Sequence, residues 1–241
     1  MPGELENRSE TIAIIGAGPL GRWLALAAAR AGFRVLLEDV MPANLHHAQE
    51  LLRQQLGPQP LAGTAFSEGG GGFIPRIKSD ESEGALAPEG SVESTGFSPY
   101  IAPAISAGAL APDETLPVAF VSTIEEAVRN ADLVIDCVPD ELESKLEILL
   151  LLDRMAPPRT VFATPTTRHS IADLASCTYR PTQCVAIVAE ANALAENPET
   201  GAAREILLRT TVQTAPETVA LLDRFWRQLG FTPRFDQDPA S

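Results

Sequence analysis

The 241-residue sequence is poor in cysteine, histidine and aromatic residues. Its three cysteines, Cys137, Cys177 and Cys184, are an odd number without metal-ligand spacing, so no disulfide framework and no metal site is predicted. Free thiols in a reducing compartment are the simplest interpretation, and we expect a cytoplasmic protein. No apolar run has the length of a membrane span, and the polar N-terminus MPGELENRSE does not resemble a secretory signal.

Basic residues are also scarce. The chain has 18 Lys and Arg against 32 Asp and Glu, which gives a formal net charge of -14 and a pI near 4.6. This charge argues against nucleic acid or an anionic membrane as a partner. A small-molecule substrate and a bound dinucleotide stay compatible with it, because backbone N–H groups can meet the phosphates of a dinucleotide locally.

A strand–helix–strand unit between Thr11 and Asp39 organises the chain. It has a β-branched apolar run over 12–15, closely spaced glycines, a helical pattern over 20–31 and a second apolar run over 33–37. The Gly-x-Gly-x-x-Gly spacing alone is weak evidence. The whole series, ending in an acid, predicts a dinucleotide-binding unit. A glycine-rich turn that binds nothing is the alternative.

Each glycine of this turn has a physical role in binding a pyrophosphate. Gly16 permits the tight turn, Gly18 lets the backbone approach the pyrophosphate, and Gly21 lets the helix pack closely on the strand. The free N–H groups at the start of the helix favour the phosphate charges. The predicted cofactor contacts in this turn are Gly16, Ala17, Gly18, Pro19, Leu20 and Gly21.

A carboxylate at the end of the second strand selects the dinucleotide. It can accept both ribose hydroxyls and it repels a 2′-phosphate, so the predicted cofactor is NAD rather than NADP. Asp39 or Glu38 could serve, but adjacent strand residues face opposite ways and one alone can point at the ribose.

The middle of the chain differs in composition. Residues 58–117 contain nine glycines and eight prolines, and eight acids against two bases. Such a segment cannot bury enough apolar surface to offset its chain entropy. We predict a flexible insertion over 58–104, with a possible short helix around 100–110, inside a single NAD-binding domain over 11–241.

Order returns at residue 118, with alternating strands and helices. This alternation predicts an α/β protein of the Rossmann type, with a doubly wound and mainly parallel sheet. Strands are expected over 118–121, 131–138, 160–164, 184–189, 206–212 and 232–235, and helices from Thr123, over 141–154, 171–175 and 216–229.

In such a sheet, ligands bind outside the carboxyl ends of the strands. Lys145 could reach this edge, although a surface lysine paired with Glu141 is an equal alternative. Thr166 and Thr167 offer hydroxyls there, with helix capping as the alternative. His169 is the only histidine near the edge and the candidate proton-transfer base, with an ordinary surface histidine as the alternative.

Five sequence blocks, by their residues and their order along the chain, resemble the NAD-binding domain of the 3-hydroxyacyl-CoA dehydrogenases. The blocks are GAGPLGRWLA, AGFRVLLED, ADLVIDCVPDELESK, APPRTVFATPTTRHSIADLA and YRP. The resemblance covers 11–56 and 118–187, and the tail loosely. It implies an NAD-dependent oxidoreductase of fatty acid metabolism, which transfers a hydride between C3 of a 3-hydroxyacyl-CoA and NAD.

The resemblance also implies roles for single residues. Asp39 would bind the adenosine ribose, and Asp140 stands where the family has a glutamate near the nicotinamide ribose. Lys145 matches a family lysine at the cofactor, and Thr167 matches a serine that contacts cofactor and substrate. Glu205 matches the glutamate that orients the catalytic histidine.

The sequence departs from the family where the chemistry is done. Val188 stands at the catalytic histidine, Ala191 at the following asparagine and Pro165 at a second asparagine. The family's helical second domain has no counterpart in this sequence, so we expect a homo-oligomer or a partner subunit to supply it.

Two main hypotheses follow. In the first, the chain is a dehydrogenase whose catalytic residues are Thr167, His169 and Glu205, with His169 or a residue of a partner as the base. In the second, it is a non-catalytic NAD-binding module that acts with a partner protein. A dehydrogenase for another small hydroxy acid is a third possibility.

Overall fold

The structure is a computed structural model that describes residues 10–57, 117–189 and 204–238, all within one compact unit. The insertion predicted over 58–104, the short helix around 100–110 and Ala191 lie outside the described residues. The boundaries predicted for the domain and its insertion therefore stay predictions.

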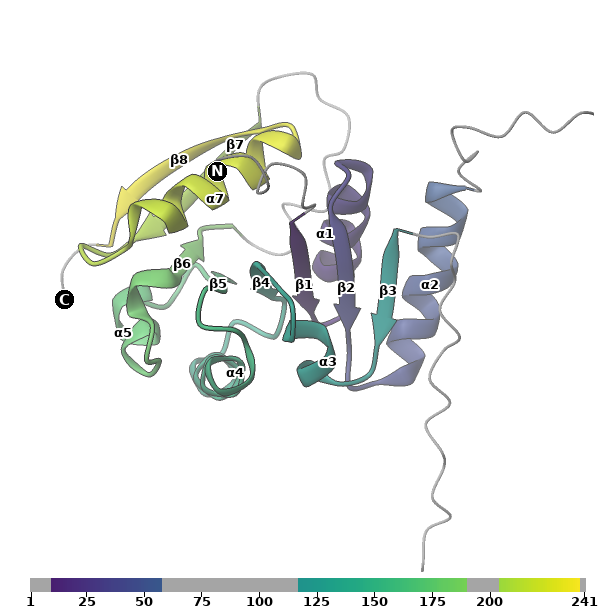
Figure 1. Ribbon diagram of the computed structural model, residues 1–241, viewed down its shortest axis with the longest axis horizontal. Coiled ribbons are helices and arrows are strands. Elements are labelled where there is room, and N and C mark those ends of the chain that lie inside the picture. The colour runs from purple at the N-terminus through teal and green to yellow at the C-terminus, as the bar shows by residue number, and fades with distance from the viewer. Residues whose placement is uncertain (1–9, 58–116, 190–203, 239–241) are drawn as a thin grey trace, which may run out of the picture. The chain divides into compact units, whose positions relative to one another are not determined.

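Eight strands form one sheet in the order β3-β2-β1-β4-β5-β6-β7-β8 (Figure 1). The first six strands run parallel, β7 is antiparallel to β6, and β8 is parallel to β7. The predicted Rossmann-type, mainly parallel sheet is confirmed. Its strands are β1 (Thr11–Ile15), β2 (Arg34–Glu38), β3 (Val118–Val121), β4 (Leu133–Asp136), β5 (Val161–Pro165), β6 (Cys184–Ile187), β7 (Arg204–Thr210) and β8 (Phe231–Gln237).

Helices cover both faces of the sheet, as the alternation of elements predicts. One apolar core lies under α1 (Pro19–Arg30), α2 (Pro42–Leu56) and α7 (Pro216–Gln228). A second core lies under α3 (Ile124–Val128), α4 (Leu142–Met155) and α5 (Ile171–Ser176). No helix in the described part of the chain is long and apolar enough to cross a membrane.

The sequence explains where most of these helices begin. Pro19, Pro42 and Pro216 each open a helix, where a missing N–H costs nothing and the fixed φ angle suits the first turn. The hydroxyls of Thr123 and Ser170 accept the N–H groups of Glu126 and Asp173, so both predicted caps are confirmed.

The scarce aromatic residues gather where the last helix meets the sheet. On α7, Phe225 and Trp226 are fully buried, and their rings lie 5.3 Å apart. Trp226 packs edge-on to Phe231 of β8, and Phe231 in turn meets Trp23 of α1. These contacts hold α7 and β8 against α1 of the first β-α-β unit, because the rings bury large apolar areas.

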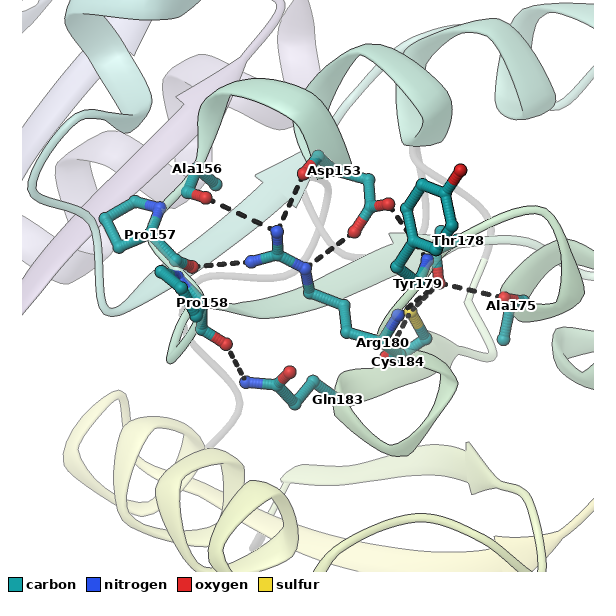
Figure 2. Close-up of polar contacts among 10 residues, drawn as sticks. All are labelled: Asp153, Ala156, Pro157, Pro158, Ala175, Thr178, Tyr179, Arg180, Gln183 and Cys184. Carbon is teal, nitrogen blue, oxygen red and sulfur yellow. Dashed lines mark hydrogen bonds and ion pairs between the residues drawn. The ribbon is translucent and has the colours of Figure 1, made fainter.

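Arg180, in the YRP block, joins the end of α4 to the start of β6 (Figure 2). Its guanidinium donates to Asp153 Oδ1 at 2.6 Å and to the carbonyl oxygens of Asp153, Ala156 and Pro157. Asp153 Oδ2 accepts the N–H of Tyr179 at 2.9 Å, so both carboxylate oxygens are used. We call Arg180, Asp153 and these partners the Arg180 cluster.

Candidate functional site

The glycine turn between β1 and α1 has the geometry of a pyrophosphate site. Gly16 has a φ of +102°, a backbone conformation that favours glycine. A Cβ on Gly21 would lie 1.8 Å from the carbonyl oxygen of Gly16, so a side chain there would push the helix off the strand. A Cβ on Gly18 would meet no atom of the described residues within 4 Å. The turn is therefore tightly packed where Gly21 meets Gly16, and open on the side that a side chain of residue 18 would occupy.

Asp39, directly after β2, faces this turn. Its Oδ2 accepts the N–H of Ala17 at 2.8 Å, and its Oδ1 accepts the N–H of Met41 at 2.8 Å. The guanidinium of Arg22 donates to the carbonyl oxygen of Ala17 at 3.0 Å, so the peptide groups on both sides of Ala17 are held. Of the two candidate acids, Asp39 is the one placed beside the pyrophosphate turn.

Glu38 lies on the opposite side of β2, the side of Leu36, and is 4% exposed. Burial, together with the neighbouring charge of Asp39, raises the pKa of Glu38 to about 7. The alternative assignment of Glu38 to the ribose does not fit this orientation, because its carboxylate points away from Ala17.

Asp140, Thr167 and His169 meet at the carboxyl ends of β4 and β5. Asp140 Oδ2 accepts the N–H of Thr167 at 3.1 Å. His169 Nε2 lies 3.4 Å from the carbonyl oxygen of Asp140 and 3.8 Å from its Oδ1. That Oδ1 atom is buried and has no hydrogen-bond partner in the described part of the chain. The structure thus brings together three of the predicted site residues.

The two neighbouring threonines differ in role. Thr166 is buried, and its hydroxyl accepts the N–H groups of Arg168 and His169, so it closes the turn after β5, whereas Ser170 caps the following helix. The side chain of Thr167 is exposed, and its hydroxyl makes no hydrogen bond with the described residues. Thr167 therefore keeps its hydroxyl available for a ligand.

The end of β8 holds the segment that carries His169. Ser170 Oγ donates to Asp238 Oδ2 at 2.5 Å, and the N–H of Ala172 donates to the same oxygen at 3.1 Å. The N–H of Asp238 is bonded to Thr210 of β7 at 2.7 Å. No local pattern predicts this contact, because Ser170 and Asp238 are 68 residues apart.

Lys145 requires a correction. Its side chain is fully buried, and its Nζ lies 2.6 Å from Asp136 Oδ1. It is therefore neither the surface lysine paired with Glu141 nor a residue that reaches out to cofactor or substrate. Burial raises the pKa of Asp136, although the Lys145 charge opposes this rise. Sequence reasoning missed Asp136, although a lone acid that ends an apolar strand was a visible signal.

Glu205 lies apart from His169. Its carboxylate pairs with Arg234 of β8 at 3.2 Å and is 61% exposed. It makes no hydrogen bond or ion pair with Asp140, Thr167 or His169 in the described residues. It lines a cavity of about 730 Å³ together with Val188, Ala189, Ile206, Leu207, Arg234, Phe235 and Asp236. The expectation that Glu205 supports His169 is thus not met, because β7 presents Glu205 beside Val188 instead.

These features fit NAD. The space above Gly18 admits a pyrophosphate, the start of α1 offers backbone N–H groups, and Asp39 stands at the ribose position. Asp140, Thr167 and His169 lie on the same edge of the sheet, after β4 and β5. The residues present are those that an NAD site of this fold needs.

Solved structures share this fold. The (S)-3-hydroxybutyryl-CoA dehydrogenase of Ralstonia eutropha superposes with a TM-score of 0.63 at 19% identity, over 96% of this chain and 65% of that one. A diketoreductase superposes with a TM-score of 0.64 at 21% identity, over 97% and 66% of the two chains.

Two relatives by sequence are dehydrogenases that are longer than this chain. A probable 3-hydroxybutyryl-CoA dehydrogenase of Bacillus subtilis is 26% identical over 174 residues, 72% of this chain and 46% of the relative. The 5-formyl-3-hydroxy-2-methylpyridine 4-carboxylate 5-dehydrogenase of Mesorhizobium japonicum is 25% identical over 222 residues, 92% of this chain and 55% of the relative. The chain thus spans about half the length of these relatives.

The family assignment rests on a match to most of the chain. Residues 11–87 and 109–192 match the family described as "3-hydroxyacyl-CoA dehydrogenase, NAD binding domain". The matched region contains the glycine turn, Asp39, Asp140 and His169, and it confirms NAD as the expected cofactor. The chain belongs to the NAD-binding domain family of the 3-hydroxyacyl-CoA dehydrogenases.

Proposed function

We propose that this chain is an NAD-dependent oxidoreductase domain that acts on a 3-hydroxyacyl-CoA or on the matching 3-oxoacyl-CoA. NAD, when bound, supplies the hydride acceptor at its nicotinamide ring. The observation that carries the proposal is the joint placement of the glycine turn with Asp39 and of the group Asp140, Thr167 and His169. Both lie at the carboxyl edge of one parallel sheet.

His169 is the proposed base. As the substrate C3–H bond gives its electron pair to the cofactor, a base must take the hydroxyl proton, and neutral imidazole is suited to this at neutral pH. Both the carbonyl oxygen and Oδ1 of Asp140 face Nε2 of the His169 ring, at 3.4 Å and 3.8 Å. The other ring nitrogen, Nδ1, is therefore the one proposed to accept the substrate proton. The Thr167 hydroxyl is proposed to hold the substrate oxygen.

The finer features of the function are also proposals. The acyl-CoA substrate class is supported by the family and by the named activity of the Bacillus subtilis relative. A partner subunit or a second copy is proposed to contribute to the substrate site, because Val188 stands where the family has its catalytic histidine. A cytoplasmic location is supported by the three free cysteines.

A second candidate function is a non-catalytic NAD-binding module. One observation favours it: Val188 stands at the family's histidine position and lines the cavity that Glu205 also lines. Valine cannot accept a proton from a hydroxyl. This candidate predicts NADH binding without turnover, whether or not His169 is present.

Two measurements on the intact chain separate these candidates. Titration of NADH by fluorescence is expected to show binding, and Asp39→Ala is expected to abolish most of it. Turnover of acetoacetyl-CoA with NADH is expected to fall by about 10²- to 10⁴-fold in His169→Ala, as for the loss of a general base.

His46→Ala is the matched control, because His46 is an exposed histidine on α2. Turnover that survives His169→Ala would remove His169 from the role of base. NADH binding with no turnover of the wild-type chain would leave the binding module as its function.

A further inference from the structure

The Asp39 carboxylate has no acceptor capacity to spare. A carboxylate offers about four lone-pair positions, two on each oxygen. Oδ1 accepts the N–H of Met41 at 2.8 Å and the side-chain amide of Asn44 at 3.2 Å. Oδ2 accepts the N–H of Ala17 at 2.8 Å and the same amide nitrogen at 3.1 Å. All four positions are therefore in use.

The bonds from Met41 and Ala17 are part of the backbone turn, but the bonds from Asn44 are not. Asn44 is an exposed residue in the first turn of α2, and its amide group can rotate away without moving the backbone. Its Nδ2 lies 3.2 Å from Oδ1 and 3.1 Å from Oδ2, so one N–H is shared between both oxygens of Asp39. A ribose diol would use the same two oxygens from its two hydroxyls. The amide of Asn44 thus takes the positions that the ribose needs.

We propose that Asn44 competes with the adenosine ribose for Asp39 and lowers the affinity of the chain for NAD. The inference rests on the proposed binding of NAD at this turn. The amide and the diol donate to the same lone pairs, and Asp39 cannot accept both while Ala17 and Met41 remain bonded. Binding of the dinucleotide therefore exchanges one shared N–H of Asn44 for two O–H···O bonds from the ribose.

The size of the effect follows from what the free chain loses. When Asn44 leaves, the chain gives up an internal hydrogen bond to a charged group, whereas an alanine variant gives up only water at the same oxygens. Because Asn44 is exposed and its N–H is shared between two oxygens, we take the net value of an ordinary hydrogen bond, about a three- to tenfold change in an equilibrium constant. Asn44→Ala is thus expected to bind NADH about three- to tenfold more tightly than the wild-type chain.

The experiment compares NADH affinity in the wild-type chain, in Asn44→Ala and in Gln54→Ala, by fluorescence titration. Gln54 is the matched control, because it is an exposed amide on the same helix that makes no hydrogen bond with Asp39. Tighter binding in Asn44→Ala, with Gln54→Ala at the wild-type value, is the expected result. Equal or weaker binding in Asn44→Ala, with the wild-type chain still binding NADH, would overturn this inference alone.

A second measurement follows the amide itself. The side-chain NH₂ signals of Asn44 in a ¹⁵N spectrum are expected to move towards those of a free amide when NADH is added. Signals that stay in place at saturating NADH would show that Asn44 keeps its bonds to Asp39, and would overturn the competition. If neither the wild-type chain nor Asn44→Ala binds NADH, the proposed function fails together with this inference.

Discussion

Two buried acid–base pairs lie at opposite edges of the sheet and are built differently. At the amino edge, Arg180 makes four hydrogen bonds, and both oxygens of Asp153 have partners (Figure 2). At the carboxyl edge, Lys145 and Asp136 share one contact of 2.6 Å, and Asp136 Oδ2 is buried without a partner among the described residues. The first pair is a saturated network, and the second is not.

This difference in hydrogen bonding affects how much each pair stabilises the fold. A satisfied polar network fixes one arrangement of the chain, whereas a buried group without partners carries a cost in stability. The carboxyl edge also contains Asp140 Oδ1, a second buried acceptor without a partner in the described residues. We infer that the Arg180 cluster at the amino edge stabilises the fold more than the pair of Lys145 and Asp136 at the carboxyl edge.

The largest expected loss of stability follows from disrupting the Arg180 cluster. Arg180→Ala removes four hydrogen bonds and leaves the carboxylate of Asp153, which is 3% exposed, without its cation. The loss of one partner of a buried pair typically costs about 3–5 kcal/mol, and we expect a loss of this size in the free energy of unfolding by urea. NADH affinity, measured where the variant is folded, should stay unchanged. A loss below about 1 kcal/mol would show that the Arg180 cluster does not stabilise the fold.

A smaller loss is expected at the other edge. Lys145→Met leaves Asp136 without its cation, but a carboxyl whose pKa burial already raises can take up a proton instead of staying charged. We expect a loss of about 2–3 kcal/mol in the free energy of unfolding at pH 8, and less at pH 5. In Lys145→Met combined with Asp136→Asn, most of the loss should be recovered. A loss at Lys145 that exceeds the loss at Arg180 would contradict the comparison.

The carboxyl edge contains both features that the sequence predicted and features that it did not. The glycine turn and the mainly parallel sheet follow from local patterns, and the structure bears them out. These features depend on neighbours within one strand–helix–strand unit, where spacing fixes direction.

Features that need tertiary contact could not be predicted in this way. Lys145 looked equally suited to solvent, because helix spacing shows its neighbour Glu141 but not the strand end beneath it. The contact between Ser170 and Asp238 joins the start of α5 to the end of β8, and it depends on the antiparallel pairing of β7 with β6. Glu205 was assigned by its place in a motif, whereas its direction depends on the pairing of β7 with β8.

The smallest expected effect concerns Glu38, a third acid at the carboxyl edge. Its pKa is raised from about 4.5 to about 7, first by burial and then by the charge of Asp39. Between these pH values the folded chain keeps a proton that the unfolded chain releases, so stability should fall as the pH rises from 4.5 to 7.

Glu38→Gln removes this penalty and should stabilise the fold at pH 8 by about 1–2 kcal/mol, after allowance for solvent at the sheet edge. At pH 4.5 or below the variant should match the wild-type chain, because Glu38 is then protonated in the folded chain and largely so in the unfolded chain. Urea unfolding of both proteins at pH 8 and pH 4.5 measures the difference. An equal effect of the substitution at both pH values would show that the ionisation of Glu38 places no cost on this edge.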